Sequence, residues 1–234
     1  MISSIKKTGL TFAPESAEPD IQKAIGKTMD REILFRSAGV AYQKGWQKLK
    51  LYFMVGFPVN IETEVNEIAR LAREISELKR NYSKFPAEIR VSVNPFVPKP
   101  HTAFQWFGMK DRESLQRSRN NLLFHNSRRI TYEFYDVGRA MLEACLSRGN
   151  RRVGRIIFDA WRNGAKMDSW DEFFNFSIWE KAFSDNNAHI ESFATKQYSL
   201  EDPLPWSHIK TDVSDTFLKE ELLDSGFPVP RSGE

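Results

Sequence analysis

The sequence predicts an α/β fold in which a parallel sheet is followed by a mostly helical region. Three short segments, 8–12, 48–55 and 88–96, combine β-branched and aromatic residues in the pattern of buried strands. The segments between them place apolar residues at helical spacing. Strand and helix together repeat about every 35–45 residues, which is typical of parallel βα units. Three strands are few for a complete sheet, so we expect one half of a barrel or of an open sheet.

The first unit begins with the strand TGLTF at 8–12. Pro14 lacks the N–H that a strand ladder needs, so Glu15 and Ser16 are predicted to lie in the loop after the strand. The helix that follows has Pro19 near its first turn, where a missing N–H costs nothing.

The second unit contains a helix over 30–45 and the strand 48–55. This strand ends at Gly56, and either Asn60 or Thr63 can cap the next helix with its side-chain oxygen. Apolar residues recur on one face of that helix. They are Val65, Ile68, Leu71, Ala72 and Ile75.

Beyond Lys110 the composition shifts to charged, helix-forming sequence. Helices are expected at 111–125, 138–148, 151–163 and 214–223, and a strand could lie at 129–137. We therefore expect the sheet region to span 1–109, a helical extension 110–225 and a tail 226–234. Four tryptophans are predicted to anchor a small core in the extension: Trp161, Trp170, Trp179 and Trp206.

Composition excludes several classes of protein. Apolar residues make up 41% of the 234, enough for a real core, and the net charge of +3 is too weak to indicate nucleic-acid binding by itself. The chain has no apolar run long enough to cross a membrane and opens without the apolar region of a signal peptide. We expect a cytoplasmic protein with no membrane partner. The single cysteine, Cys145, excludes an internal disulfide and is predicted to be a buried free thiol.

Four motifs resemble, in order, the carboxyl-terminal half of a radical S-adenosylmethionine (radical SAM) domain: TGLTFAPES, IGK, KGWQKLKLYFMVGFP and VNPFVPKPHTAFQW. The likeness is to bacterial proteins that join a cobalamin-binding domain to a radical SAM domain of the elongator and tRNA-methylthiotransferase type. The later stretches EACLSRGNRR, GAKMDSWDEFF and EDPLPWSHI look like the extension of the same uncharacterised family. The resemblance covers nearly the whole chain and is silent on the substrate.

The resemblance implies the second half of a partial TIM-type (β/α) barrel of about six units. In the family, a 4Fe–4S cluster held by a CxxxCxxC loop cleaves SAM reductively to a 5′-deoxyadenosyl radical. This chain has one cysteine and cannot supply the three thiolates. We therefore expect an amino-terminal truncation or a split gene, with the missing half of the barrel in the same parent chain or in a separate subunit. Cobalamin could serve the parent protein.

The resemblance also places eight residues on the adenine and ribose side of a SAM pocket: Glu15, Ser16, Lys27, Met54, Gly56, Pro58, Asn94 and Phe96. In the family, the position of Glu15 faces the ribose, that of Lys27 can meet the methionine carboxylate, and that of Gly56 lets the backbone approach the adenine. The chain departs from the family pattern at 59–61, which separates the proline from the usual Glu-Thr pair at 62–63.

Most of these positions have a structural alternative. Glu15 could be an acid that stabilises a helix N-terminus, and Ser16 could be an N-cap. Lys27 could be a solvated surface lysine. Gly56 could belong to an ordinary turn, and Phe96 to the core.

Further candidates for substrate or partner contact follow the third strand. Lys99, His101 and Gln105 lie in a loop that mixes polar and aromatic residues. His101 as a general acid or base is one interpretation, but a single histidine beside prolines is more often structural.

The densest basic cluster consists of Arg148, Arg151, Arg152 and Arg155. Contact with a phosphate or RNA is one interpretation of it. The other is a solvated face whose arginines pair with carboxylates of the same chain, such as Glu143 or Asp159.

Three functions remain open. The chain could be part of a radical SAM enzyme with an unknown substrate, acting by methyl or sulfur transfer on RNA or protein. It could be a non-catalytic partner that associates through the open sheet edge at Thr8. It could also be an RNA-binding module. We favour the first for the parent protein, and we expect this chain to be inactive alone.

Overall fold

The computed structural model describes residues 9–27 and 29–231. Their contacts divide into two compact units. The first unit extends to Phe96 and includes 113–135, and the second consists of 97–112 and the residues from Asp136 on. Residues 113–135, which the composition grouped with the helical extension, therefore belong to the first unit.

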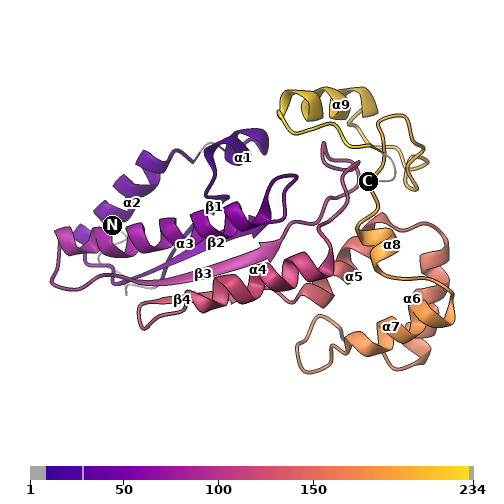
Figure 1. Ribbon diagram of the computed structural model, residues 1–234, viewed down its shortest axis with the longest axis horizontal. Coiled ribbons are helices and arrows are strands. Elements are labelled where there is room, and N and C mark those ends of the chain that lie inside the picture. The colour runs from indigo at the N-terminus through magenta and orange to yellow at the C-terminus, as the bar shows by residue number, and fades with distance from the viewer. Residues whose placement is uncertain (1–8, 28, 232–234) are drawn as a thin grey trace. The chain divides into compact units, whose positions relative to one another are not determined.

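The first unit is built on a parallel sheet, which has four strands within the described residues (Figure 1). These strands lie in the order in which they occur along the chain, namely β1 (Leu10–Glu15), β2 (Lys48–Val55), β3 (Glu88–Pro95) and β4 (Ile130–Phe134). The predicted α/β class and parallel sheet are confirmed, and the strand that could lie at 129–137 is β4.

The helices of this unit form where capping and apolar spacing predict them. They are α1 (Pro19–Ala24), α2 (Arg31–Gln43), α3 (Ile61–Leu78) and α4 (Arg112–Phe124), and the short helix η2 (Lys79–Asn81) follows α3. Asn60 caps α3, because its side-chain oxygen accepts hydrogen bonds from the N–H groups of Glu62 and Thr63. The buried stripe of α3 contains all five apolar residues expected for it.

The helices cover one face of the sheet. On β2, Leu49, Leu51 and Phe53 are buried and belong to the same core as residues of α2, α3 and α4, whereas Lys50 and Tyr52 point to the other face and are partly exposed. Buried and more exposed side chains alternate in the same way along β3 and β4. Because the strand order never reverses, right-handed crossovers place every connecting helix on the same side. The opposite face of the sheet is polar.

The second unit is helical and has its own core. Its helices are α5 (Val137–Arg148), α6 (Arg152–Arg162), α7 (Phe176–Asp185), α8 (Glu191–Ala194) and α9 (Asp215–Asp224). One buried cluster joins the loop after β3 to α9 and to the segment before it. Its members are Trp106, Phe107, Tyr198, Leu204, Trp206, Leu218 and Leu222.

The tryptophan prediction is half wrong. Trp179 and Trp206 are buried, but Trp161 and Trp170 are 55% and 61% exposed. On α6 the buried residues are Val153, Ile156 and Ala160, so Trp161 lies one position off the buried stripe. No helix in the described ranges combines the length and the apolar character needed to cross a membrane.

Candidate functional site

The carboxyl ends of β1, β2 and β3 bring the predicted SAM-site residues to one edge of the sheet. The strands are parallel, so their ends meet there, and Met54 and Asn94 are direct neighbours in the register of β2 and β3. Glu15 at the end of β1 is the neighbour of Phe53. Residues up to 79 positions apart in the sequence therefore meet at this edge, which is where parallel α/β sheets bind ligands.

Glu15 lies at the end of β1, so its predicted placement in a loop is wrong. The register of β1 shifts between Phe12 and Glu15, and this bulge accommodates Pro14 without breaking the strand. Among the described strands β1 lies at the edge of the sheet, where proline removes no second ladder. The amide of Gln22 donates to the carbonyl oxygens of Pro14 and Ser16 at 3.3 and 2.7 Å and so holds the bulge in place.

The backbone of Glu15 is strained, and its side chain meets a second predicted site residue. Its φ of 66° is in the left-handed region, which residues other than glycine rarely adopt. The carboxylate lies 3.4 Å from the ammonium of Lys27, and the two side chains are 22% and 55% exposed. An accessible carboxylate and an accessible ammonium group thus lie side by side near the carboxyl ends of the strands.

Ser16 serves the fold. It is buried, and its hydroxyl oxygen accepts a hydrogen bond from the N–H of Glu18 at 3.1 Å, just before α1 begins. This is the local, cap-like use of serine that was the alternative to ligand contact.

The loop after β2 is fixed by a buried carboxylate that sequence reasoning missed. Gly56 has a φ of 98°, so a glycine is required there. Its N–H donates to Oε2 of Glu64 at 3.0 Å, and Glu64 is only 2% exposed. The signal available in the sequence was an acid in the first turn of the helix after a Gly-x-Pro loop, where negative charge is favoured.

Aromatic packing joins this loop to the end of β3. The rings of Phe57 and Phe96 stack with centroids 4.4 Å apart, and Phe57 is fully buried. Pro58 and Phe96 are partly exposed, and Asn94 is exposed. Phe96 therefore combines the two roles considered for it, since it packs on the loop and keeps part of its surface at the edge.

The loop residues Lys99, His101 and Gln105 lie in the second unit. Lys99 forms an ion pair with Glu143. Gln105 is fully buried, and its side-chain oxygen accepts from the N–H of His101 at 3.0 Å and from the indole of Trp206 at 2.7 Å. These contacts give Gln105 a structural role. His101 is partly exposed, and its φ of 58° is in the left-handed region.

The predicted basic cluster is divided by the fold. Arg148 is 1% exposed and donates to the carbonyl oxygens of Pro98, Gln105 and Lys196 at 3.4, 3.1 and 2.7 Å. Its guanidinium also lies over the rings of Tyr198 and Trp206. Burial lowers the pKa of Arg148 to about 10, so it stays charged at neutral pH. This side chain is not placed to meet an external phosphate.

The remaining arginines of the cluster are exposed. Arg151 is at the start of α6, and Arg152 donates to the carbonyl oxygens of Asn186 and Asn187. Arg155 pairs with Asp159 at 3.0 Å, which is one of the two carboxylates expected as partners.

The described residues do not fit an iron–sulfur cluster. Cys145 is buried, and burial raises the pKa of its thiol to about 12, so the thiolate form that binds iron is disfavoured. Within the part of the chain that the structure describes, no group of three histidine, cysteine, aspartate or glutamate side chains is placed to hold a metal ion.

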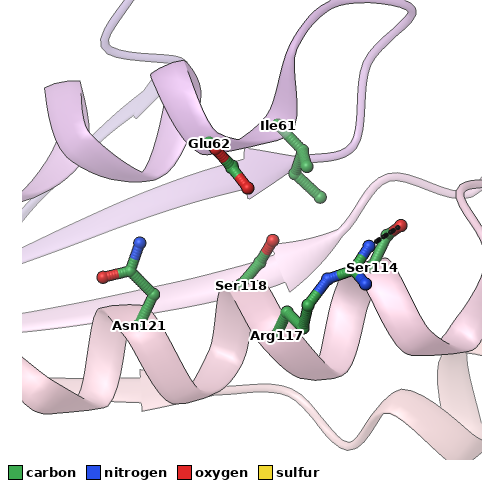
Figure 2. A pocket seen from close by; sticks show the side chains of 6 residues that line it. All are labelled: Ile61, Glu62, Ser114, Arg117, Ser118 and Asn121. Carbon is green, nitrogen blue, oxygen red and sulfur yellow. Dashed lines mark hydrogen bonds between the residues drawn. The ribbon is translucent and has the colours of Figure 1, made fainter.

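A small polar hollow lies between the first turn of α3 and the helix α4 (Figure 2). It encloses about 200 Å³ and is lined by Ile61, Glu62, Ser114, Arg117, Ser118 and Asn121. Arg117 donates to Glu113 and to the hydroxyl of Ser114 at 2.8 and 3.2 Å. Its guanidinium is thus engaged within its own helix, and we assign no function to this hollow.

One curated protein is similar to this chain in sequence. No family model matches the chain, and no solved structure matches it. An uncharacterized protein of Methanocaldococcus jannaschii is 25% identical over 155 residues, which are 65% of this chain. The match spans 33% of that relative, so the chain corresponds to about a third of its length.

Proposed function

We propose that this chain is part of a radical SAM protein and contributes the adenine and ribose side of its SAM pocket. The four motifs in the sequence suggest this family, and the meeting of their residues at one sheet edge is the observation that carries the proposal. Residues drawn from three separate strand ends share that edge: Glu15, Lys27, Met54, Gly56 and Asn94.

The chemistry of this edge suits SAM. The carboxylate of Glu15 can accept hydrogen bonds from ribose hydroxyls, and the ammonium of Lys27 can pair with the methionine carboxylate. Strain at Glu15 is of the kind that proteins retain at binding sites. When SAM is bound beside a reduced cluster, it supplies the radical that such enzymes use.

One-sided helix coverage supports a half-barrel as the setting. Parallel sheets are normally covered on both faces, either by helices or by closure into a barrel. Here the helices lie on one face, and the other carries partly exposed side chains such as Tyr52, Met54 and Ser92. In a partial TIM-type barrel this second face would line the interior, and further strands would pair with the edge of β1.

The cluster ligands would have to come from outside these residues, because Cys145 is buried and lies in the second unit. The proposal therefore assigns to this chain binding and orientation of SAM, and no redox step.

A titration of the isotope-labelled chain with SAM, and with S-adenosylhomocysteine as a stable analogue, tests this function by NMR. We expect the amide signals of Glu15, Lys27 and Gly56 to shift in a saturable manner, since NMR detects weak binding by an incomplete pocket. Lys27→Ala should weaken the binding, whereas Lys23→Ala, an exposed lysine on α1, should not.

Absence of shifts at these amides with either ligand would overturn the proposal. Shifts that map to other residues, or that survive Lys27→Ala together with Glu15→Gln, would do the same.

A further inference from the structure

A second cavity lies at the opposite end of the sheet, where β2, β3 and β4 begin. It encloses about 330 Å³ and belongs entirely to the first unit. We call it the basic groove, and it is lined by Gly9, Lys48, Leu49, Lys50, Glu88, Ile89, Arg90, Arg128, Arg129 and Thr131. Because it lies at the amino ends of the strands, it is separate from the edge that carries Glu15.

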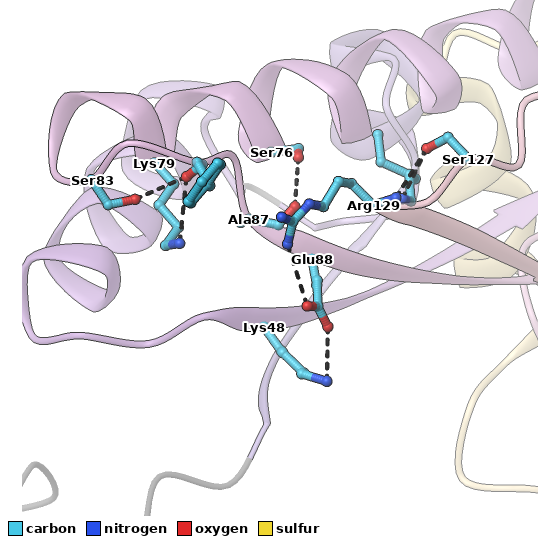
Figure 3. Close-up of polar contacts among 10 residues, drawn as sticks. Lys48, Ser76, Lys79, Ser83, Ala87, Glu88, Ser127 and Arg129 are labelled. Carbon is cyan, nitrogen blue, oxygen red and sulfur yellow. Dashed lines mark hydrogen bonds and ion pairs between the residues drawn. The ribbon is translucent and has the colours of Figure 1, made fainter.

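The wall of the groove has five cations and one carboxylate. That carboxylate, Glu88, is held by Lys48 at 2.8 Å and by Arg129 at 3.4 Å, and Figure 3 shows both side chains converging on it. These contacts, that of Lys48 first, lower the pKa of Glu88. In the described residues, Lys50 and Arg128 have no carboxylate within ion-pair distance, so the groove keeps an excess of positive charge.

The cations are arranged across neighbouring strands. Lys50 and Arg90 are register partners in β2 and β3, so their backbones lie about 5 Å apart across the sheet. Arg90 is 3.4 Å from Glu133 on β4, and Lys50 lies over the ring of Tyr52 at 4.6 Å. The groove therefore presents a row of cations, in which Arg90 is paired with Glu133 and Lys50 has no carboxylate partner among the described residues.

An exposed aromatic ring stands beside this row. Phe85, in the loop before β3, is 56% exposed, and the guanidinium of Arg129 lies 5.8 Å from its ring centroid. The loop is held in place because Lys79 and Ser83 both donate to the carbonyl oxygen of Phe85, at 3.4 and 2.8 Å (Figure 3). The backbone of Phe85 is thus held in place, and its ring is exposed beside Arg129.

We propose that the basic groove and Phe85 bind single-stranded nucleic acid, with phosphates along the cations and a base stacked on Phe85. A positive groove beside an exposed aromatic ring is the arrangement that single-strand binders use. A protein partner with an acidic surface would use the cations but would have no need of a stacking ring. The inference does not rest on SAM binding, which concerns the other end of the sheet. In the half-barrel proposed above, Lys50 and Arg90 would lie at the amino-terminal mouth, where the strands begin.

Fluorescence anisotropy of the full chain with labelled oligouridylate and oligothymidylate of about 12 nucleotides tests the proposal. We expect the double variant Lys50→Glu, Arg128→Glu to weaken binding about tenfold or more and to flatten its salt dependence. Phe85→Leu should weaken binding about tenfold with the salt dependence unchanged, because it removes stacking alone. A difference between the two oligonucleotides would identify RNA or DNA as the preferred strand.

The matched control is Lys166→Glu, Lys210→Glu, which changes the net charge equally at two exposed lysines of the second unit. If the control pair weakens binding as much as the groove pair, the attraction is only that of net charge and the proposal fails. It also fails if neither groove variant affects binding, or if inorganic phosphate at low concentration competes fully. Should the Glu pair not fold, Lys50→Gln, Arg128→Gln gives the same comparison.

Discussion

At the scale of single residues, Glu18 shows how burial converts a common acid into a pH-dependent element. Its Oε1 atom is buried and has no hydrogen-bond partner in the described chain. Burial raises the pKa of Glu18 above the ordinary 4.5, and the nearby carboxylates of Glu67 and Asp20 raise it further against the opposing effect of Arg70. The folded state thus favours the protonated form. Stability from this group is present below pH 4.5 and is lost as the pH rises through the folded pKa.

Replacing Glu18 by glutamine should therefore stabilise the protein at neutral pH. We expect Glu18→Gln to raise the melting temperature by about 1–2 °C at pH 7 and to leave it unchanged near pH 4. Thermal unfolding followed by circular dichroism at both pH values measures this. Glu32→Gln, an exposed acid in the first turn of α2, should give no gain at pH 7. A Glu18→Gln gain that is equal at both pH values would contradict the explanation.

At the scale of elements, the strands and helices could be predicted because local patterns determine them. β2 and β3 begin and end within a residue or two of their predicted bounds, and α3 begins after one of the two caps expected for it, since alternation and capping are properties of neighbouring residues. The exceptions depend on distant groups. Glu15 stays in β1 because Gln22 holds the bulge, and Arg148 is buried because three carbonyl oxygens from two distant segments converge on it. Charge alone predicts an exposed arginine, and no local pattern reports such partners.

The cap of α3 is one such local determinant, and its contribution can be measured. Asn60→Ala removes the acceptor for the N–H groups of Glu62 and Thr63 and should cost about 1 kcal/mol, or a melting-temperature decrease of about 2–4 °C. Asn66→Ala, an exposed position inside the same helix, should be neutral or slightly stabilising because alanine is the better helix former. Equal losses at both positions would show that asparagine at 60 acts otherwise than as a cap.

At the scale of the whole molecule, each of the two units is stabilised by buried residues of its own. The first is built from β2, β3 and the helices on them, and one core cluster of the second is built around Trp106, Trp206 and Leu222. Contacts inside each unit are what stabilise it, so we expect substitutions to act within the unit that carries them. The two proposed sites of the sheet belong to the first unit, and the buried Arg148 belongs to the second.

Hydrogen exchange followed by mass spectrometry of two variants measures this independence. Leu51→Ala leaves a cavity in the sheet core and should cost about 2–5 kcal/mol, which speeds exchange in β2, β3 and α3 by about 30-fold or more. Arg148→Met leaves three carbonyl oxygens without their donor and should speed exchange in α5 and in the segment around Lys196. Each variant should leave the other unit close to its original rates. If either substitution accelerates both units alike, the two cores unfold as one cooperative body, and the division of the chain into separately stabilised units is wrong.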